Sequence, residues 1–128
     1  CVDRAARMLN EFGKAMKNAS VLVLGVAYKQ DIDDYRESPA LRVIEILKRE
    51  KADVEFYDPW VAEYKYNGTV KKGIEKISPE IIKDYDLVMI TTAHSNVDYK
   101  MVQENATAVF DTKNVMKYVV ERENIEVL

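Results

Sequence analysis

The sequence is poor in cysteine, in long apolar runs and in excess positive charge, and each shortage excludes a class of protein. One cysteine among 128 residues excludes an internal disulfide and a cysteine-based metal cluster. No apolar run approaches the length of a membrane span, and no charged segment followed by an apolar core opens the chain. The formal net charge of −3 argues against a nucleic-acid partner, because phosphate backbones are bound by clustered Lys and Arg in excess. We therefore expect a cytoplasmic protein with no membrane partner.

What the sequence contains instead is a regular alternation of strand and helix patterns. Residues 21–26 are a β-branched and aliphatic run interrupted only by Gly25, which is typical of a strand buried on both faces of a parallel sheet. Ser38 and Pro39 then match the N-cap and the first position of a helix. The predicted strands are 21–26, 53–57, 87–92 and 108–110, and the predicted helices are 3–18, 39–50, 79–85 and 98–105.

This alternation predicts an α/β fold with a doubly wound parallel sheet and helices on both faces, formed by residues 1–128 as a single domain. Within it, residues 1–20 hold a leading helix with Asp3 as its N-cap. Because the chain begins with Cys1 rather than Met, we expect it to be a fragment of a longer protein.

Two segments are harder to interpret. Residues 60–78 are expected to be an irregular connection, in which Asn67-Gly68 is a turn signal and 70–77 a possible short strand. Residues 125–127 could either pair with the sheet or remain outside it.

The loop between the first strand and the second helix carries side chains suited to an anionic ligand. In an open α/β sheet, ligands sit beyond the carboxyl ends of the strands, where helix N-termini present free N–H groups to anions. Lys29 could meet a phosphate as a point charge, Tyr28 could lie beside a base or ribose, and Arg36 has a planar fork for two oxygens. The alternative is structural, because both cations could instead pair with the carboxylates of the same loop.

Other polar residues after strands are weaker candidates. Only Gly25 follows the first strand, so the Gly-x-Gly-x-x-Gly fingerprint is absent and NAD is not expected at this turn in the usual manner. Asp58 could accept ribose hydroxyls or cap the turn before Pro59, and the missing fingerprint favours the cap. His94, the only histidine, is expected to be a polar surface residue, and no metal site is expected because no partner ligand accompanies it.

Several strings in the chain resemble the UDP-glucose/GDP-mannose dehydrogenase family. Gly25-Val26-Ala27-Tyr28-Lys29 is followed by Asp33-Asp34-Tyr35-Arg36-Glu37-Ser38-Pro39-Ala40, and later by Tyr57-Asp58-Pro59. These residues are similar to the start of the C-terminal, UDP-binding domain of that family. Asp111-Thr112-Lys113-Asn114 is similar to a further motif, with Lys113 where the family has arginine, so the charge is kept and the two-pronged fork is lost. The resemblance covers nearly the whole chain.

The resemblance implies a Rossmann-like fold that binds the UDP part of a nucleotide sugar for an NAD-dependent UDP-sugar 6-dehydrogenase. By resemblance, Tyr28, Lys29 and Lys113 contact UDP, while Arg36 reaches toward NAD, which is held mainly by another domain. No catalytic residue is expected here, because the family's NAD-binding and catalytic-cysteine domains lie elsewhere, so the chain alone is expected to be inactive.

The partners implied in the same way are a UDP-sugar, the NAD-binding and central domains of the full-length chain, and further copies in a homo-oligomer. The residues around Arg36 lean toward the UDP-N-acetylmannosamine branch of the family, and hence toward polysaccharide biosynthesis.

Two interpretations from other classes stay open. Acidic residues follow the first and second predicted strands, threonines a third and Lys113 a fourth, which loosely matches a phosphoacceptor receiver domain of a signalling switch. The spacing is poor, since Asp33 and Asp34 lie several residues beyond the strand and the acceptor should close the third strand. The other possibility is an α/β domain that serves only as an oligomer interface.

Overall fold

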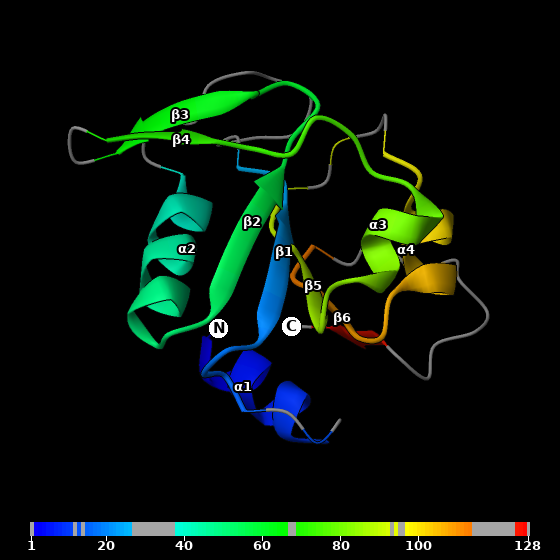
Figure 1. The fold of residues 1–128 in the computed structure, drawn as a ribbon. Helices are drawn as coiled ribbons and strands as arrows, with labels where there is room; N and C mark the ends of the chain where they lie inside the picture. The colour runs from blue at the N-terminus through cyan, green and yellow to red at the C-terminus, as the bar shows by residue number, and fades with distance from the viewer. Residues whose placement is uncertain are drawn as a thin grey trace.

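A five-stranded parallel sheet is the centre of the molecule (Figure 1). The computed structural model describes residues 2–11, 13, 15–26, 38–66, 69–92, 94, 97–113 and 125–127. The strand order across the sheet is β2-β1-β5-β6-β7. These strands are β1 (Ser20–Leu24), β2 (Asp53–Tyr57), β5 (Leu87–Ile90), β6 (Val109–Asp111) and β7 (Ile125–Val127).

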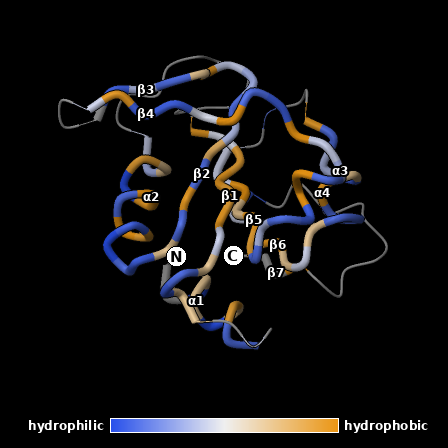
Figure 2. The backbone as a smooth tube through the Cα atoms, viewed as in Figure 1, coloured by the Kyte–Doolittle hydropathy of each residue, from blue (hydrophilic) through white to orange (hydrophobic). Residues whose placement is uncertain are grey.

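Helices cover both faces of this sheet, because the central strands are apolar on both sides. In β1, Val21 and Val23 join one apolar cluster while Leu22 and Leu24 join the other, as the two-residue period of a strand requires. The first cluster includes residues of α1 (Val2–Glu11) and α2 (Pro39–Arg49), and the second includes residues of α3 (Pro79–Lys83) and α4 (Tyr99–Asn105). Figure 2 shows the resulting apolar stretches on the central strands. The predicted doubly wound α/β fold is confirmed.

The two helices that follow a Ser-Pro pair begin where the sequence predicts. The Ser38 hydroxyl accepts a hydrogen bond from the N–H of Ala40 at 3.3 Å, and Pro39 occupies the first helical position of α2. The Ser78 hydroxyl accepts one from the N–H of Ile81, also at 3.3 Å, at the start of α3. None of the described helices is long and apolar enough to cross a bilayer.

The expectation of an irregular connection over 60–78 is wrong for residues 63–66 and 69–72, whereas the possible short strand at 70–77 is confirmed for residues 70–72. The segment contains an antiparallel hairpin of β3 (Glu63–Tyr66) and β4 (Thr69–Lys72), which lies across the end of the sheet beside α2 (Figure 1). Tyr64 is buried, and its ring centroid lies 5.1 Å from that of Phe56 in β2. Packing of this aromatic pair therefore anchors a hairpin whose other side chains are mostly exposed.

The first helix differs from the prediction, and the last strand settles a question that the sequence left open. The leading helix ends at Glu11 rather than at residue 18, and it begins at Val2, so Asp3 lies inside it and is not the N-cap. Gly13 follows with φ of +78°, a conformation in which a helix does not continue. Residues 125–127, left open by the sequence, pair with β6 as the edge strand β7.

Candidate functional site at the carboxyl edge of the sheet

Four parallel strands end level with one another at one edge of the sheet. The register pairs Leu24 at the end of β1 with Tyr57 and with Ile90, the last residues of β2 and β5, and pairs Ile90 with Asp111 at the end of β6. Helix α2 begins at this same edge, because it carries the chain back from the end of β1 to the start of β2. We call this the carboxyl edge, and it is where open α/β sheets bind ligands.

Gly25 brings the ends of β1 and β5 into close contact. Its φ is +94°, and a Cβ built on it would lie 2.5 Å from the Cβ of Thr92 and 2.8 Å from the Thr92 nitrogen and oxygen. The N–H of Thr91 donates to the carbonyl of Leu24 at 3.0 Å, and the Thr91 hydroxyl donates to the carbonyls of Leu24 and Gly25. Glycine is required here by both the backbone conformation and the space.

Asp58 ties together the ends of three strands. Its Oδ1 accepts the N–H groups of Trp60 at 2.8 Å and Val61 at 3.2 Å, which caps the turn after β2. Its Oδ2 accepts the N–H of Val26, just beyond β1, at 2.8 Å. The same oxygen lies 2.8 Å from Nε2 of His94, which follows β5. The capping role favoured for Asp58 is confirmed. The same side chain also contacts Val26 and His94, which follow two other strands.

The prediction that His94 is a surface residue is wrong. Only 1% of its side chain is exposed, and it is paired with the fully buried Asp58 carboxylate. The pairing was missed because the two residues lie 36 positions apart in the sequence. One signal was available: both residues follow strands of the same parallel sheet within a few positions, so they were expected at the same edge.

Lys113 lies at the carboxyl edge, as its position after a predicted strand requires. The buried Asp111 carboxylate accepts the N–H of Lys113 at 3.0 Å, and the N–H of Thr112 donates to the carbonyl of Ile90 at 3.1 Å. These bonds hold the backbone of Lys113 against β5, while the side chain is exposed. A cation is thus presented to solvent at this edge.

The other predicted ligand contacts, Tyr28, Lys29 and Arg36, lie outside the described residues, as do Asp33 and Asp34. The described residues on either side of them are Val26, whose N–H is bound by Asp58, and Ser38, the N-cap of α2. Both attachment points of residues 27–37 are therefore at the same edge of the sheet as Lys113.

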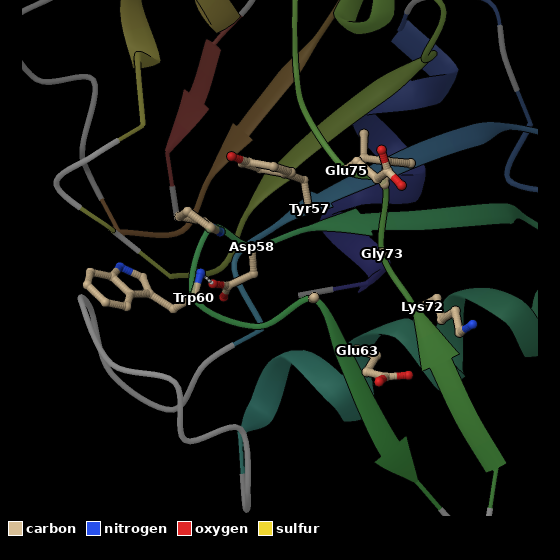
Figure 3. A pocket seen from close by; sticks show the side chains of 10 residues that line it. Tyr57, Asp58, Trp60, Glu63, Lys72, Gly73 and Glu75 are labelled. Carbon is tan, nitrogen blue, oxygen red and sulfur yellow. Dashed lines mark hydrogen bonds between the residues drawn. The ribbon is translucent and has the colours of Figure 1, made fainter.

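A pocket of about 470 Å³ opens beside the end of β2, toward the β3–β4 hairpin (Figure 3). Its lining includes Tyr57, Asp58, Trp60, Glu63, Lys72, Gly73 and Glu75. Glu63, Lys72 and Glu75 give this pocket more negative than positive charge, and Lys113 does not line it. The Trp60 ring, which is 46% exposed, points away from the hairpin in Figure 3. The excess of negative charge therefore disfavours a phosphate group in this pocket.

A larger pocket of about 630 Å³ lies along β2 next to α3 and is strongly acidic. Burial raises the pKa of the Tyr85 phenol, and the neighbouring carboxylates of Glu55, Asp53 and Asp84 raise this pKa further. The phenol donates a hydrogen bond to Glu55 Oε1 at 3.1 Å. A field that disfavours a phenolate also disfavours a phosphate, which excludes this pocket as a nucleotide phosphate site.

The turn after β1 does not fit NAD. In a dinucleotide-binding turn, glycines leave room for the pyrophosphate to approach the backbone. Here the space that Gly25 leaves open is filled by Thr92, and the chain continues with Val26. Among the described residues, no group of three or more His, Cys, Asp or Glu side chains is arranged to hold a metal ion.

Comparison with known families identifies the domain. Residues 22–118, which include all four level strand ends, match the model of the UDP-glucose/GDP-mannose dehydrogenase family, UDP binding domain. The chain belongs to this family. The match confirms the resemblance seen in the motifs, and it does not support the receiver-domain alternative.

Relatives of this UDP-binding domain are dehydrogenases of nucleotide sugars. UDP-N-acetyl-D-mannosamine dehydrogenase of Pyrococcus horikoshii is 29% identical and aligns with 77% of this chain and 22% of its own length. UDP-glucose 6-dehydrogenase 4 of Arabidopsis thaliana is 27% identical and aligns with 86% of this chain and 29% of its own length. The chain therefore spans less than a third of the length of these relatives.

Solved structures agree with this assignment. The structure of UDP-D-ManNAc dehydrogenase from Pyrococcus horikoshii matches 94% of this chain and 27% of its own, with a TM-score of 0.71 and 25% identity. A structure of the UDP-N-acetyl-mannosamine dehydrogenase from S. aureus matches 98% of this chain and 28% of its own, with a TM-score of 0.66 and 30% identity.

The geometry also argues against a phosphoacceptor. The order β2-β1-β5-β6-β7 is one that flavodoxin-like switches share, so strand order does not discriminate. In a receiver the third strand in sequence of this sheet should end in the acceptor aspartate, but β5 is followed by Thr91. Asp58 is covered and already accepts hydrogen bonds through both oxygens, so it is not open to a phosphoryl donor.

Proposed function

We propose that this domain binds the UDP part of a nucleotide sugar at the carboxyl edge, as one domain, residues 1–128, of a longer NAD-dependent UDP-sugar 6-dehydrogenase. The observation that carries the proposal is the shared edge: Lys113 and both attachment points of residues 27–37 lie at the level strand ends of a domain that belongs to this family. Tyr28, Lys29 and Lys113 would contact UDP, with the cations meeting phosphate oxygens.

The complete enzyme would oxidise the C6 alcohol of the sugar to a carboxylate. NAD would be held mainly by another domain, which agrees with the filled space at Gly25, and Arg36 would reach toward it. The substrate would be UDP-N-acetylmannosamine, a proposal supported by the names of the relatives in Pyrococcus horikoshii and S. aureus. Assembly into a homo-oligomer and a cytoplasmic location stay predictions.

A chemical-shift titration of the chain with UDP tests the proposal. We expect saturable shifts at Lys113 and at Val26, with a dissociation constant roughly in the high-micromolar to millimolar range, because one face of the site is open. Lys113→Ala should weaken binding about threefold to tenfold through loss of a charged hydrogen bond. Lys113→Arg should bind at least as tightly as the wild type, because it restores the two-pronged fork.

The matched control is Lys17→Ala. Lys17 is also exposed, but it precedes β1 and so lies toward the opposite edge of the sheet. Its removal should leave the UDP affinity unchanged. Absence of saturable shifts in the wild type, or equal weakening by Lys17→Ala and Lys113→Ala, would refute binding of UDP at the carboxyl edge.

A further inference from the structure

The Asp58–His94 pair is costly to bury and is not needed merely to cap a turn. The Asp58 side chain is 0% exposed and that of His94 is 1% exposed. A buried carboxylate is destabilising unless it is fully hydrogen-bonded, and apolar residues of similar volume often do as well for stability alone. A single oxygen, Oδ1, already caps the turn at Trp60 and Val61. The second oxygen therefore needs its own explanation.

The second oxygen connects the two other strand ends. Oδ2 accepts the N–H of Val26 and lies within hydrogen-bond distance of His94 Nε2, both at 2.8 Å. An ionised carboxylate can only accept hydrogen bonds, so Nε2 of His94 must carry the proton. This fixes one tautomer of the imidazole and makes His94 a donor that orients the oxygen holding Val26.

Val26 is the last described residue before 27–37, the segment that carries Tyr28 and Lys29. Its peptide N–H is directed at Asp58 instead of at a neighbouring strand. A shift of Asp58 Oδ2 would therefore move the point from which that segment starts. Tyr28 and Lys29 follow Val26 by two and three positions in the sequence.

We propose that Asp58 and His94 are positioning residues for nucleotide binding: the Nε2–H of His94 orients the Asp58 carboxylate, which sets the start of the segment after β1. This inference rests on the proposed binding of UDP. His94 does not contact the nucleotide in this scheme. It acts through Asp58 and Val26. If His94 only filled space, UDP binding would not depend on its N–H.

The test compares three variants of His94 in the same chain. His94→Gln places an amide N–H close to the position of Nε2, whereas His94→Leu keeps apolar volume without a donor and His94→Asn carries a donor that is too short to reach. UDP affinity is measured by titration and the Val26 amide by hydrogen exchange. The imidazole nitrogen spectrum of the wild type reports the tautomer, and with one histidine in the sequence its signals belong to His94.

We expect an Nε2-protonated imidazole in the wild type. His94→Leu and His94→Asn should weaken UDP binding about tenfold, the size of one well-placed hydrogen bond, and speed exchange at Val26. His94→Gln should stay within about threefold of the wild type in affinity. If the His94→Leu variant fails to fold, the UDP affinities of His94→Gln and His94→Asn are compared instead, and this comparison tests the role of the N–H.

Two results would overturn the inference while leaving the proposed function intact: wild-type affinity in a folded His94→Leu or His94→Asn variant, or a His94→Gln variant as weak as those two. An Nδ1-protonated imidazole would also overturn it. A wild-type chain that does not bind UDP would be recognised separately, in the titration without any variant, and would remove the proposed function and this inference together.

Discussion

At the scale of single residues, Gly25 is a position where the backbone conformation and the neighbouring chain both require glycine. Its left-handed conformation and the contact with Thr92 allow β1 and β5 to end against each other. This contact takes up the space that a dinucleotide-binding glycine would leave for a pyrophosphate. The same residue therefore explains both the tight junction of the strands and the lack of room for a pyrophosphate beside Gly25.

Gly25→Ala should destabilise the domain strongly. The left-handed conformation and the overlap with Thr92 each cost about 1–3 kcal/mol, because neither the backbone nor the strand end can yield freely. Urea denaturation gives the difference in the free energy of unfolding.

Gly13→Ala is the matched control for this substitution. Gly13 has φ of +78° but no atom within 4 Å of a built Cβ, so only the conformational cost should remain. Equal loss of stability in both variants would show that the contact with Thr92 is not tight.

At the scale of elements, α2 is the helix whose start matters most for the site. Its N-cap Ser38 lies at the carboxyl edge and is the first described residue after 27–37. The helix is held to the sheet by buried apolar residues, namely Ala40, Leu41, Ile44 and Leu47. Its position is therefore set by packing, while its first turn depends on the cap.

Ser38→Ala should lower the free energy of unfolding by about 1 kcal/mol, because the N–H of Ala40 loses its side-chain acceptor. Ser38→Thr keeps a hydroxyl and should recover most of this loss. Both can be measured by chemical denaturation with unchanged dependence on denaturant. A threonine variant as unstable as the alanine variant would indicate that packing of the buried serine, and not capping, is what matters.

At the scale of the whole molecule, two apolar layers enclose a sheet whose functional groups gather at one edge. The layers meet the sheet through alternate residues of the same strands, so helices are needed on both sides. Catalysis of the proposed oxidation would need groups beyond this domain. The described residues include Lys113 and the start of α2 at the carboxyl edge. Their only buried pair of an acid and a base, Asp58 and His94, connects residues at the ends of strands.

The 128-residue chain alone should therefore show no turnover with a UDP-sugar and NAD, even under conditions in which UDP binds. Formation of reduced nicotinamide, followed by its absorbance, is the measurement. A chain that includes the remaining domains of the proposed dehydrogenase should be active in the same assay. Measurable turnover by the 128-residue chain would contradict the proposal that it acts only as the nucleotide-binding domain.

Local signals were sufficient for the main elements. The run from Val21 to Val26 is apolar at consecutive positions, and such a strand must be covered on both faces. The Ser-Pro pairs at 38 and 78 mark helix starts because the cap and the first position are satisfied within a few residues. The motifs around Gly25 and Arg36 sufficed for the family as well, because they are ordered strings of specific residues.

The hairpin was not predictable in the same way. Residues 63–72 are mostly polar, and most of those whose burial is described are exposed. The hairpin is held in place through Tyr64, whose burial depends on Phe56 in a separate strand. A strand pair with little apolar surface of its own depends on such a contact. Local pattern alone could identify the turn signal at 67–68 but not the pairing around it.

By itself, the sequence determined the fold class, the starts of α2 and α3 and the family, because each depends on residues that are close together along the chain. Only the tertiary structure decided that His94 is buried with its Nε2 2.8 Å from Asp58 Oδ2, and that Thr92 fills the space beside Gly25. Those contacts join residues brought together by the register of parallel strands. Hydrogen bonds and close packing are sensitive to changes of a few tenths of an ångström in the distance between atoms. The order of residues along the chain does not specify such distances.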